Sequence, residues 1–239
     1  MSSVVALINY FVRCVALTCV IFFVPAVSYA QALITKSIEL STFTAVSLET
    51  VGDLLIERDS KHRFAIEAEP KVVALIAVKV ESNVLRIFAT GDFKTDKPIK
   101  LRVHLPKLND IALRSSGDIL VEKWQSDKIS LLVTGSGSVK ATAISAEKAV
   151  VQITGAGDIT LAGSVANLIA EINGTGTIDA AKLSVASATA TIEGSGDINL
   201  NVSNHLKATV NGSGTITYQG NPKITESVEG AGEIIKQGP

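Results

Sequence analysis

A short phrase with two glycines recurs through the C-terminal half of the chain and constrains the fold more than any other feature. Each copy has an aliphatic residue, a spacer, Gly, a small residue, Gly, a polar residue and another aliphatic residue; in the first copy Ser115 replaces the first glycine. Successive second glycines are 20, 20, 19, 20, 18 and 18 residues apart. This regularity indicates structural units stacked on one another. The second glycines are Gly117, Gly137, Gly157, Gly176, Gly196, Gly214 and Gly232.

The residues around each bend alternate between apolar and polar, as in a strand with one buried face. Ile, Leu or Val stands two positions before the first glycine position and two positions after the second in all seven copies. We expect the glycines to supply positive φ or close backbone approach at a bend. Coils stacked about 4.8 Å apart then pair in parallel. The sequence predicts an all-β fold, a single-stranded parallel β-helix, right-handed by the general preference of crossovers.

A repeat of strand, helix and strand is the alternative for this spacing, but 18 to 20 residues leave little room for a helix. The last copy has Glu226 and Lys236 where earlier copies have mainly apolar residues. These two charges predict a polar end that opposes end-to-end stacking of the coils.

The segment before the repeats also reads as strands, because apolar and polar residues alternate in short runs between turn residues. We expect an N-terminal, partly antiparallel β region at 31–106, which leads into and caps the stack, and β-helix repeats at 107–239. The valines of 72–80 favour a strand there over a helix. Residues 51–58 match 116–123 almost position for position, which predicts that the stack starts near residue 48 and is interrupted by an excursion.

The first thirty residues have the pattern of a secretory signal peptide. Arg13 precedes an apolar run that ends in Ser28, Tyr29 and Ala30, with small residues at the positions that a signal peptidase requires. An uncleaved membrane anchor is the alternative, and it is the only membrane contact that the sequence suggests. We therefore expect an exported protein of the periplasm or outer cell envelope, or a secreted one. Both cysteines, Cys14 and Cys19, lie in this segment, so the mature chain has no disulfides.

The charge balance of the mature chain argues against a nucleic-acid partner. Arg13 is the one charged residue of the first thirty, so 21 basic residues remain against 23 acidic ones. A nucleic-acid-binding domain normally has a basic excess on one face. Aromatic residues are also scarce and follow no stripe, which gives little support to carbohydrate binding on aromatic platforms.

Acidic and hydroxyl residues alternate at the position after each second glycine. The acids are candidate members of a surface binding ladder, and stacking in register would place them about 10 Å apart on every second coil. Calcium takes six to eight oxygen ligands, which this spacing does not supply, so we expect neither a metal nor a cofactor. The alternative is that the alternation keeps like charges off adjacent strands. The four acids are Asp118, Asp158, Asp197 and Glu233.

Catalytic residues are not evident. His62, His104 and His205 are far apart in the sequence, and no arginine follows Arg114. The sequence therefore predicts that the protein is not an enzyme. A polysaccharide-active hydrolase or lyase of the β-helix type is the first alternative, and a structural envelope protein is the second.

The chain resembles the putative auto-transporter adhesin, head GIN domain family over nearly all of its mature length. The resemblance rests on Phe43-x-x-Val46, on 51–54, on Asn83-x-Leu85-x-Ile87 and on the succession of G-x-G-[DST]-[IV] coils, although a Gly-Ile-Asn tripeptide is absent. It implies a β-helical relative of pectin-lyase-type folds without a defined catalytic set. Residues and resemblance together predict a non-enzymatic interaction or adhesion module that contacts an envelope or extracellular protein or polysaccharide.

Overall fold

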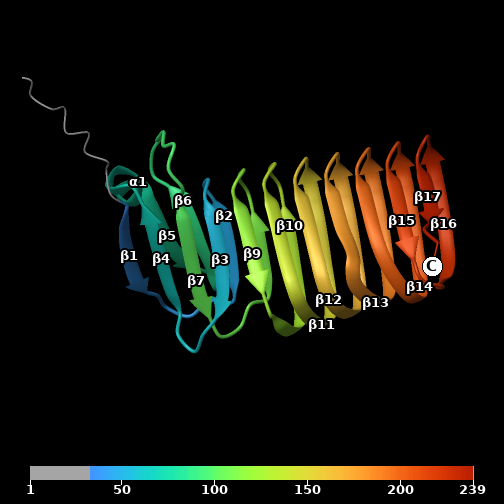
Figure 1. Ribbon diagram of the computed structural model, residues 1–239, viewed down its shortest axis with the longest axis horizontal. Helices are drawn as coiled ribbons and strands as arrows, with labels where there is room; N and C mark the ends of the chain where they lie inside the picture. The colour runs from blue at the N-terminus through green and yellow to red at the C-terminus, as the bar shows by residue number, and fades with distance from the viewer. Residues whose placement is uncertain (1–32, 239) are drawn as a thin grey trace, which may run out of the picture. The chain divides into compact units, whose positions relative to one another are not determined.

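The computed structural model describes residues 33–238 and is a solenoid of parallel β-coils with two long walls (Figure 1). The predicted signal peptide, 1–30, lies outside the described residues. One hydrophobic core runs from Phe43 to Ile216 without interruption. No helix in 33–238 has the length and apolar character needed to cross a membrane. The predicted all-β, parallel β-helical fold is confirmed, including an N-terminal region that is partly antiparallel.

Each coil contributes one strand segment to each wall, and these segments form two ladders. Wall A runs through β1 (Ile34–Glu39), β4 (Arg63–Ala68), β7 (Lys100–Leu105), β3 (Asp53–Arg58), β9 (Asp118–Glu122), the first halves of β11 to β14, β15 (Thr215–Gln219) and β17 (Glu233–Lys236). Wall B runs through β5 (Ile76–Glu81), β6 (Val84–Ala89), β2 (Ala45–Glu49), β8 (Asp110–Leu113), β10 (Gln125–Val133), the second halves of β11 to β14, and β16 (Lys223–Gly230). The four long strands that join the walls are β11 (Ser138–Gly155), β12 (Asp158–Gly174), β13 (Thr177–Gly194) and β14 (Asp197–Gly212).

The interior of the solenoid consists of stacked aliphatic columns, as the sequence predicts. Ile159 pairs with Ile178 and Ile178 with Ile198, and all three side chains have no exposed surface. On wall B, Ile153, Ile172 and Ile192 form an equivalent column. Burying each such side chain contributes about 2 kcal/mol of transfer free energy, so the columns are the main source of stability in a chain whose mature part has no cysteine.

Backbone conformation and close approach between coils both require glycine at the bends. Gly155, a first glycine, has φ +133°, a conformation that side-chain-bearing residues rarely adopt. Gly157, a second glycine, has no such φ, but a Cβ there would lie 2.6 Å from the carbonyl oxygen of Gly137 in the preceding coil. Gly174, the next first glycine, combines both conditions: its φ is +140°, and a Cβ there would also meet the carbonyl oxygen of Gly155. Close backbone approach is thus found at both glycines of the bends, and positive φ at the first glycines from Gly155 onward.

The N-terminal coils do not follow chain order. β2 lies between β6 and β8, and β3 lies between β7 and β9, so the coil β6–β7 is outside the coil β2–β3 (Figure 1). Asp53 pairs with Asp118 and Leu54 with Ile119, which confirms the predicted alignment of 51–58 with 116–123. The predicted excursion thus adds a coil at the outer end before the chain rejoins the stack at β8.

A short helix closes the N-terminal end, where the valines favoured a strand. α1 (Pro70–Leu75) buries Val72 and Val73, and β5 begins only at Ile76. Pro70 at the start of the helix has the φ that a first helical turn requires and no N–H to leave unpaired. The strand prediction for 72–75 is therefore wrong, because covering the open end of the core outweighs the β-propensity of the valines.

Glu69 ties the start of α1 to the loop before β7. Its carboxylate accepts a hydrogen bond from Thr95 Oγ1 at 2.6 Å and lies 3.3 Å from Lys71 Nζ and 3.7 Å from Lys97 Nζ, and the residue is only 6% exposed. The Thr95 hydrogen bond, followed by the hydrogen bond and charge of Lys71 and the charge of Lys97, lowers the Glu69 pKa below its ordinary value of 4.5, although burial acts in the opposite direction.

Substitution of a second glycine should destabilise the solenoid. We expect Gly157→Ala to lower the free energy of unfolding by about 2 kcal/mol or more, because the new methyl group meets a carbonyl oxygen of the next coil. The measurement is the urea midpoint. Gly91→Ala is the matched control, since its methyl group would meet only Leu75 Cδ2, at 3.6 Å. Equal midpoints for the two variants would contradict the role assigned to the bends.

The Glu69 contacts should be lost in acid. A carboxylate with a lowered pKa contributes stability above its ordinary pKa, and this contribution disappears as the pH falls through the folded-state value. We expect Glu69→Gln to be less stable than the wild type at about pH 7, and the difference to shrink by about pH 3.5. Denaturant titrations at both pH values measure it, with exposed Glu122→Gln as the control. A difference that does not change with pH would contradict the assignment.

Candidate functional site

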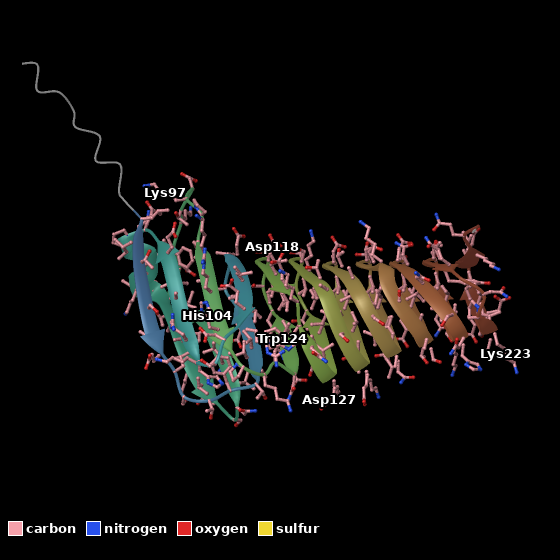
Figure 2. All side chains as sticks on the ribbon, turned by 60° about the horizontal axis from the view of Figure 1, so that its bottom comes forward. Lys97, His104, Asp118, Trp124, Asp127 and Lys223 are labelled. Carbon is pink, nitrogen blue, oxygen red and sulfur yellow. The ribbon has the colours of Figure 1, made fainter. Side chains whose placement is uncertain are left out.

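The four acids that the sequence singles out lie in one exposed column on wall A. Asp118, Asp158, Asp197 and Glu233 alternate with Ser138, Thr177 and Thr215 through successive paired strands. Figure 2 shows Asp118 on the upper side of the stack. The structure thus brings together all the residues of the predicted ladder; their role in binding stays a prediction.

Two members that the sequence analysis missed extend the column at its N-terminal end. Asp53 pairs with Asp118 on one side and with Lys100 on the other. The match of 51–58 to 116–123 was the sequence signal from which the position of Asp53 could have been predicted. Because Asp53 and Asp118 are acids on adjacent strands, avoidance of like charges does not by itself explain the alternation.

Hydrogen bonds between coils explain the alternation better. Asp118 Oδ1 accepts from Ser138 N at 3.2 Å and from Ser138 Oγ at 2.6 Å. One coil further on, Asp158 Oδ1 accepts from Thr177 N at 3.1 Å. Each of these carboxylates therefore binds a donor on the next coil, and the column fastens the coils beside the bends.

A metal site is not formed by these acids. Among residues 33–238, no three His, Cys, Asp or Glu side chains are grouped closely enough to hold a metal ion. Acids on every second strand are separated by about 10 Å, whereas ligands of one ion must all reach it within about 2.5 Å.

The three histidines have unrelated surroundings. His62 Nε2 is 3.1 Å from Phe43 O, and its ring packs edge-on against Phe43. His104 Nε2 is 3.2 Å from Glu57 Oε2 on wall A. His205 is exposed on wall B. The structure thus places them in different environments on different strands.

A shallow groove of about 880 Å³ follows the corner of the solenoid opposite the bends. Its floor is a polar ladder in which Ser145 pairs with Ser164 and Ser164 with Ser184. It was not predicted from the sequence, although four of its members stand ten positions before a first glycine and only Asn201, at eleven, departs from this spacing. We call it the serine groove, lined along five coils by Gln125, Ser145, Ser164, Ser184 and Asn201.

A second hollow of about 670 Å³ lies next to the groove on wall B. We call it the lysine trough; the polar residues that define it are Lys148, Asn167, Ser187, His205, Lys207 and Lys223. All but Lys207 form one column in register, which Lys128 extends by one coil. Every residue of the column stands seven positions before a first glycine, so counting back from the bends would have revealed it. Figure 2 shows Lys223 at the lower margin of the C-terminal end.

The acid column should act through its hydrogen bonds. We expect Asp158→Ala to lower the free energy of unfolding by about 1 kcal/mol and Asp158→Asn by less, because the amide oxygen still accepts from Thr177 N. Urea denaturation with and without millimolar Ca²⁺ measures both effects. A rise in stability with Ca²⁺ that Asp158→Asn abolishes would instead make the column a cation site.

Comparison with known proteins agrees with the fold. None of the curated proteins compared with the chain matches it. A putative adhesin from Bacteroides fragilis is 29% identical with a TM-score of 0.82, and the match covers 87% of this chain and 98% of the other. A putative lipid binding protein from Parabacteroides distasonis (19%, TM-score 0.72) and a putative adhesin from Parabacteroides merdae (22%, TM-score 0.68) match over the same shares and support the fold alone.

The family comparison confirms the resemblance that the sequence suggests. The family described as putative auto-transporter adhesin, head GIN domain, matches residues 42–222, from the coil β2–β3 to the turn before β16. This span includes six of the seven bends, the serine groove and most of the lysine trough. The chain therefore belongs to the putative auto-transporter adhesin, head GIN domain family.

Proposed function

We propose that this protein is a non-enzymatic contact module of the bacterial cell envelope, exported by its N-terminal segment and active in adhesion. It binds another envelope or extracellular macromolecule along the side of the solenoid. Support comes from the adhesin family to which the chain belongs and from the putative adhesins that share its fold. The predicted signal peptide supports export to the periplasm, the outer envelope or the medium.

The observation that carries the proposal is the serine groove. It extends over five coils, and its lining offers short hydroxyl and amide side chains on a regular strand spacing. An open hollow of this length suits a polymer or the surface of another macromolecule, which is how solenoids generally bind. A small substrate, by contrast, is normally enclosed by a deep and mostly apolar pocket.

The arrangement of the acids also supports contact over catalysis. Hydrolysis of a glycosidic bond requires two carboxyl groups about 5 to 10 Å apart on opposite sides of the bond, with one of them protonated. Asp118 and Asp158 instead lie along one flat column and accept hydrogen bonds from the neighbouring coil.

Filling the groove should weaken binding to envelope fractions without unfolding the protein. We expect Ser164→Trp/Ser184→Trp to bind isolated envelope polysaccharide and protein fractions at least about tenfold more weakly than the wild type, because two indoles occupy the floor of the groove. Immobilised full-length protein, with retention measured for each fraction, provides the test. Circular dichroism checks that the variant is folded.

The matched control carries the same two indoles on wall A, as Thr160→Trp/Asn199→Trp. These residues face outward in one column with Asp179, away from the groove. The control should retain the wild-type affinity. Release of reducing or unsaturated sugar ends from any fraction would show an enzyme and overturn the proposal, as would equal losses of binding in both double variants.

A further inference from the structure

The lysine trough is basic, although the chain as a whole is not. The mature chain has slightly more acidic than basic residues, yet the residues that line the trough include three lysines and a histidine and no carboxylate. Lys207 follows His205 by two positions on the same strand, and Lys223 pairs with His205 from the next coil. Three basic side chains thus gather at the C-terminal end of the trough.

The lysines of the trough are available to a ligand. Within 33–238, the side chains of Lys148, Lys207 and Lys223 have neither an ion pair nor a hydrogen bond, and all three residues are exposed. The acid next to Lys148 in the sequence, Glu147, lines the serine groove instead. A basic surface whose charges the protein itself leaves unneutralised attracts anions.

The spacing of the charges points to an extended ligand. Lys148 and Lys223 are four strand spacings apart, roughly 19 Å, and Asn167 and Ser187 lie between them. A chain along the trough would meet ammonium groups near both ends and amide or hydroxyl groups in the middle. This order suits a polymer with anionic groups at intervals and hydroxyl groups between them.

We propose that the lysine trough binds a linear acidic polysaccharide, one that carries carboxylate or sulfate groups. This inference rests on the proposed contact function and names the chemistry of its ligand. The ammonium groups of Lys148, Lys207 and Lys223 pair with the anionic substituents, and Asn167, Ser187 and Thr189 exchange hydrogen bonds with sugar hydroxyl groups.

Other polyanions fit the trough less well. A peptide binds a sheet by adding a strand to a free edge, but the strands under the middle of the trough are paired on both sides. A membrane surface requires exposed aromatic or large apolar anchors, whereas Ile169, the large apolar side chain that faces outward there, is half-buried and not fully exposed. Single-stranded nucleic acid requires aromatic stacking platforms, and the lining contains none.

The test measures binding of full-length protein to dextran sulfate, polygalacturonate and uncharged dextran by isothermal titration calorimetry. We expect binding to both acidic polymers and none to dextran, with affinity falling as NaCl rises from about 0.05 M to about 0.5 M. The triple variant Lys148→Gln/Lys207→Gln/Lys223→Gln should bind roughly tenfold to a hundredfold more weakly, since each exposed ion pair contributes modestly.

The control removes the same charge elsewhere, as Lys36→Gln/Lys140→Gln/Lys182→Gln, at exposed lysines outside the trough. It should keep the wild-type affinity. The inference would be overturned by equal losses in the two triple variants, or by stronger binding to polyglutamate or to phosphatidylglycerol vesicles than to the acidic polysaccharides. It would also be overturned if the wild type bound neither acidic polysaccharide. If the acidic polysaccharides do not bind but envelope fractions are still retained through the serine groove, the inference about the lysine trough fails and the proposed contact function is kept.

Discussion

The fold depends on how closely the backbone of one coil approaches that of the next at the bends. The carbonyl oxygen of Gly137 lies where a Cβ of Gly157 would be, and the same contact recurs at every later bend. This approach keeps the bends in register, so that Gly155, Gly174 and Gly194 pair directly. With the bends aligned, residues at a fixed distance from them stack into columns. The aliphatic interior, the acid column and the lysine trough are therefore consequences of one steric condition.

The opposite corner absorbs the differences in coil length. Repeats of 18 to 20 residues share one bend register, so the extra residues bulge where the walls meet on the other side, between Ala141 and Ile144, between Thr160 and Ala162, and between Ala180 and Ser184. Small residues such as Ser164 and Ala166 line the hollow at this corner. The serine groove thus forms at the corner where coil length varies. Residues at such a corner can change without loss of stability, and binding surfaces of solenoids generally lie at such positions.

The parts of the structure that sequence analysis predicts are those tied to the glycine period. The column through Ile178 and the acid column through Asp158 follow from counting forward from the bends, and both are present. The order of the N-terminal coils did not follow, because β6 and β7 have no G-x-G bend to mark them as a coil. Most of the serine groove could also have been counted, since Gln125, Ser145, Ser164 and Ser184 keep one offset of ten residues from the next bend; only Asn201 differs, by one residue. The lysine trough was equally predictable, since its column keeps a constant offset of seven residues.

The two ends of the solenoid differ in how the interior finishes. α1 covers the N-terminal end and buries Val72 and Val73 there. At the other end, β16 and β17 have further strands on one side only among the described residues. Two of the interior columns finish there at Glu226 and Lys236, both exposed, and two others finish at Val228 and Ile234. Inward-facing charges on edge strands oppose the addition of another strand, because pairing would bury them. We expect the helix at one end and the charges at the other to oppose growth of the stack. A ligand that follows the walls meets every coil, whereas a ligand at either end meets one.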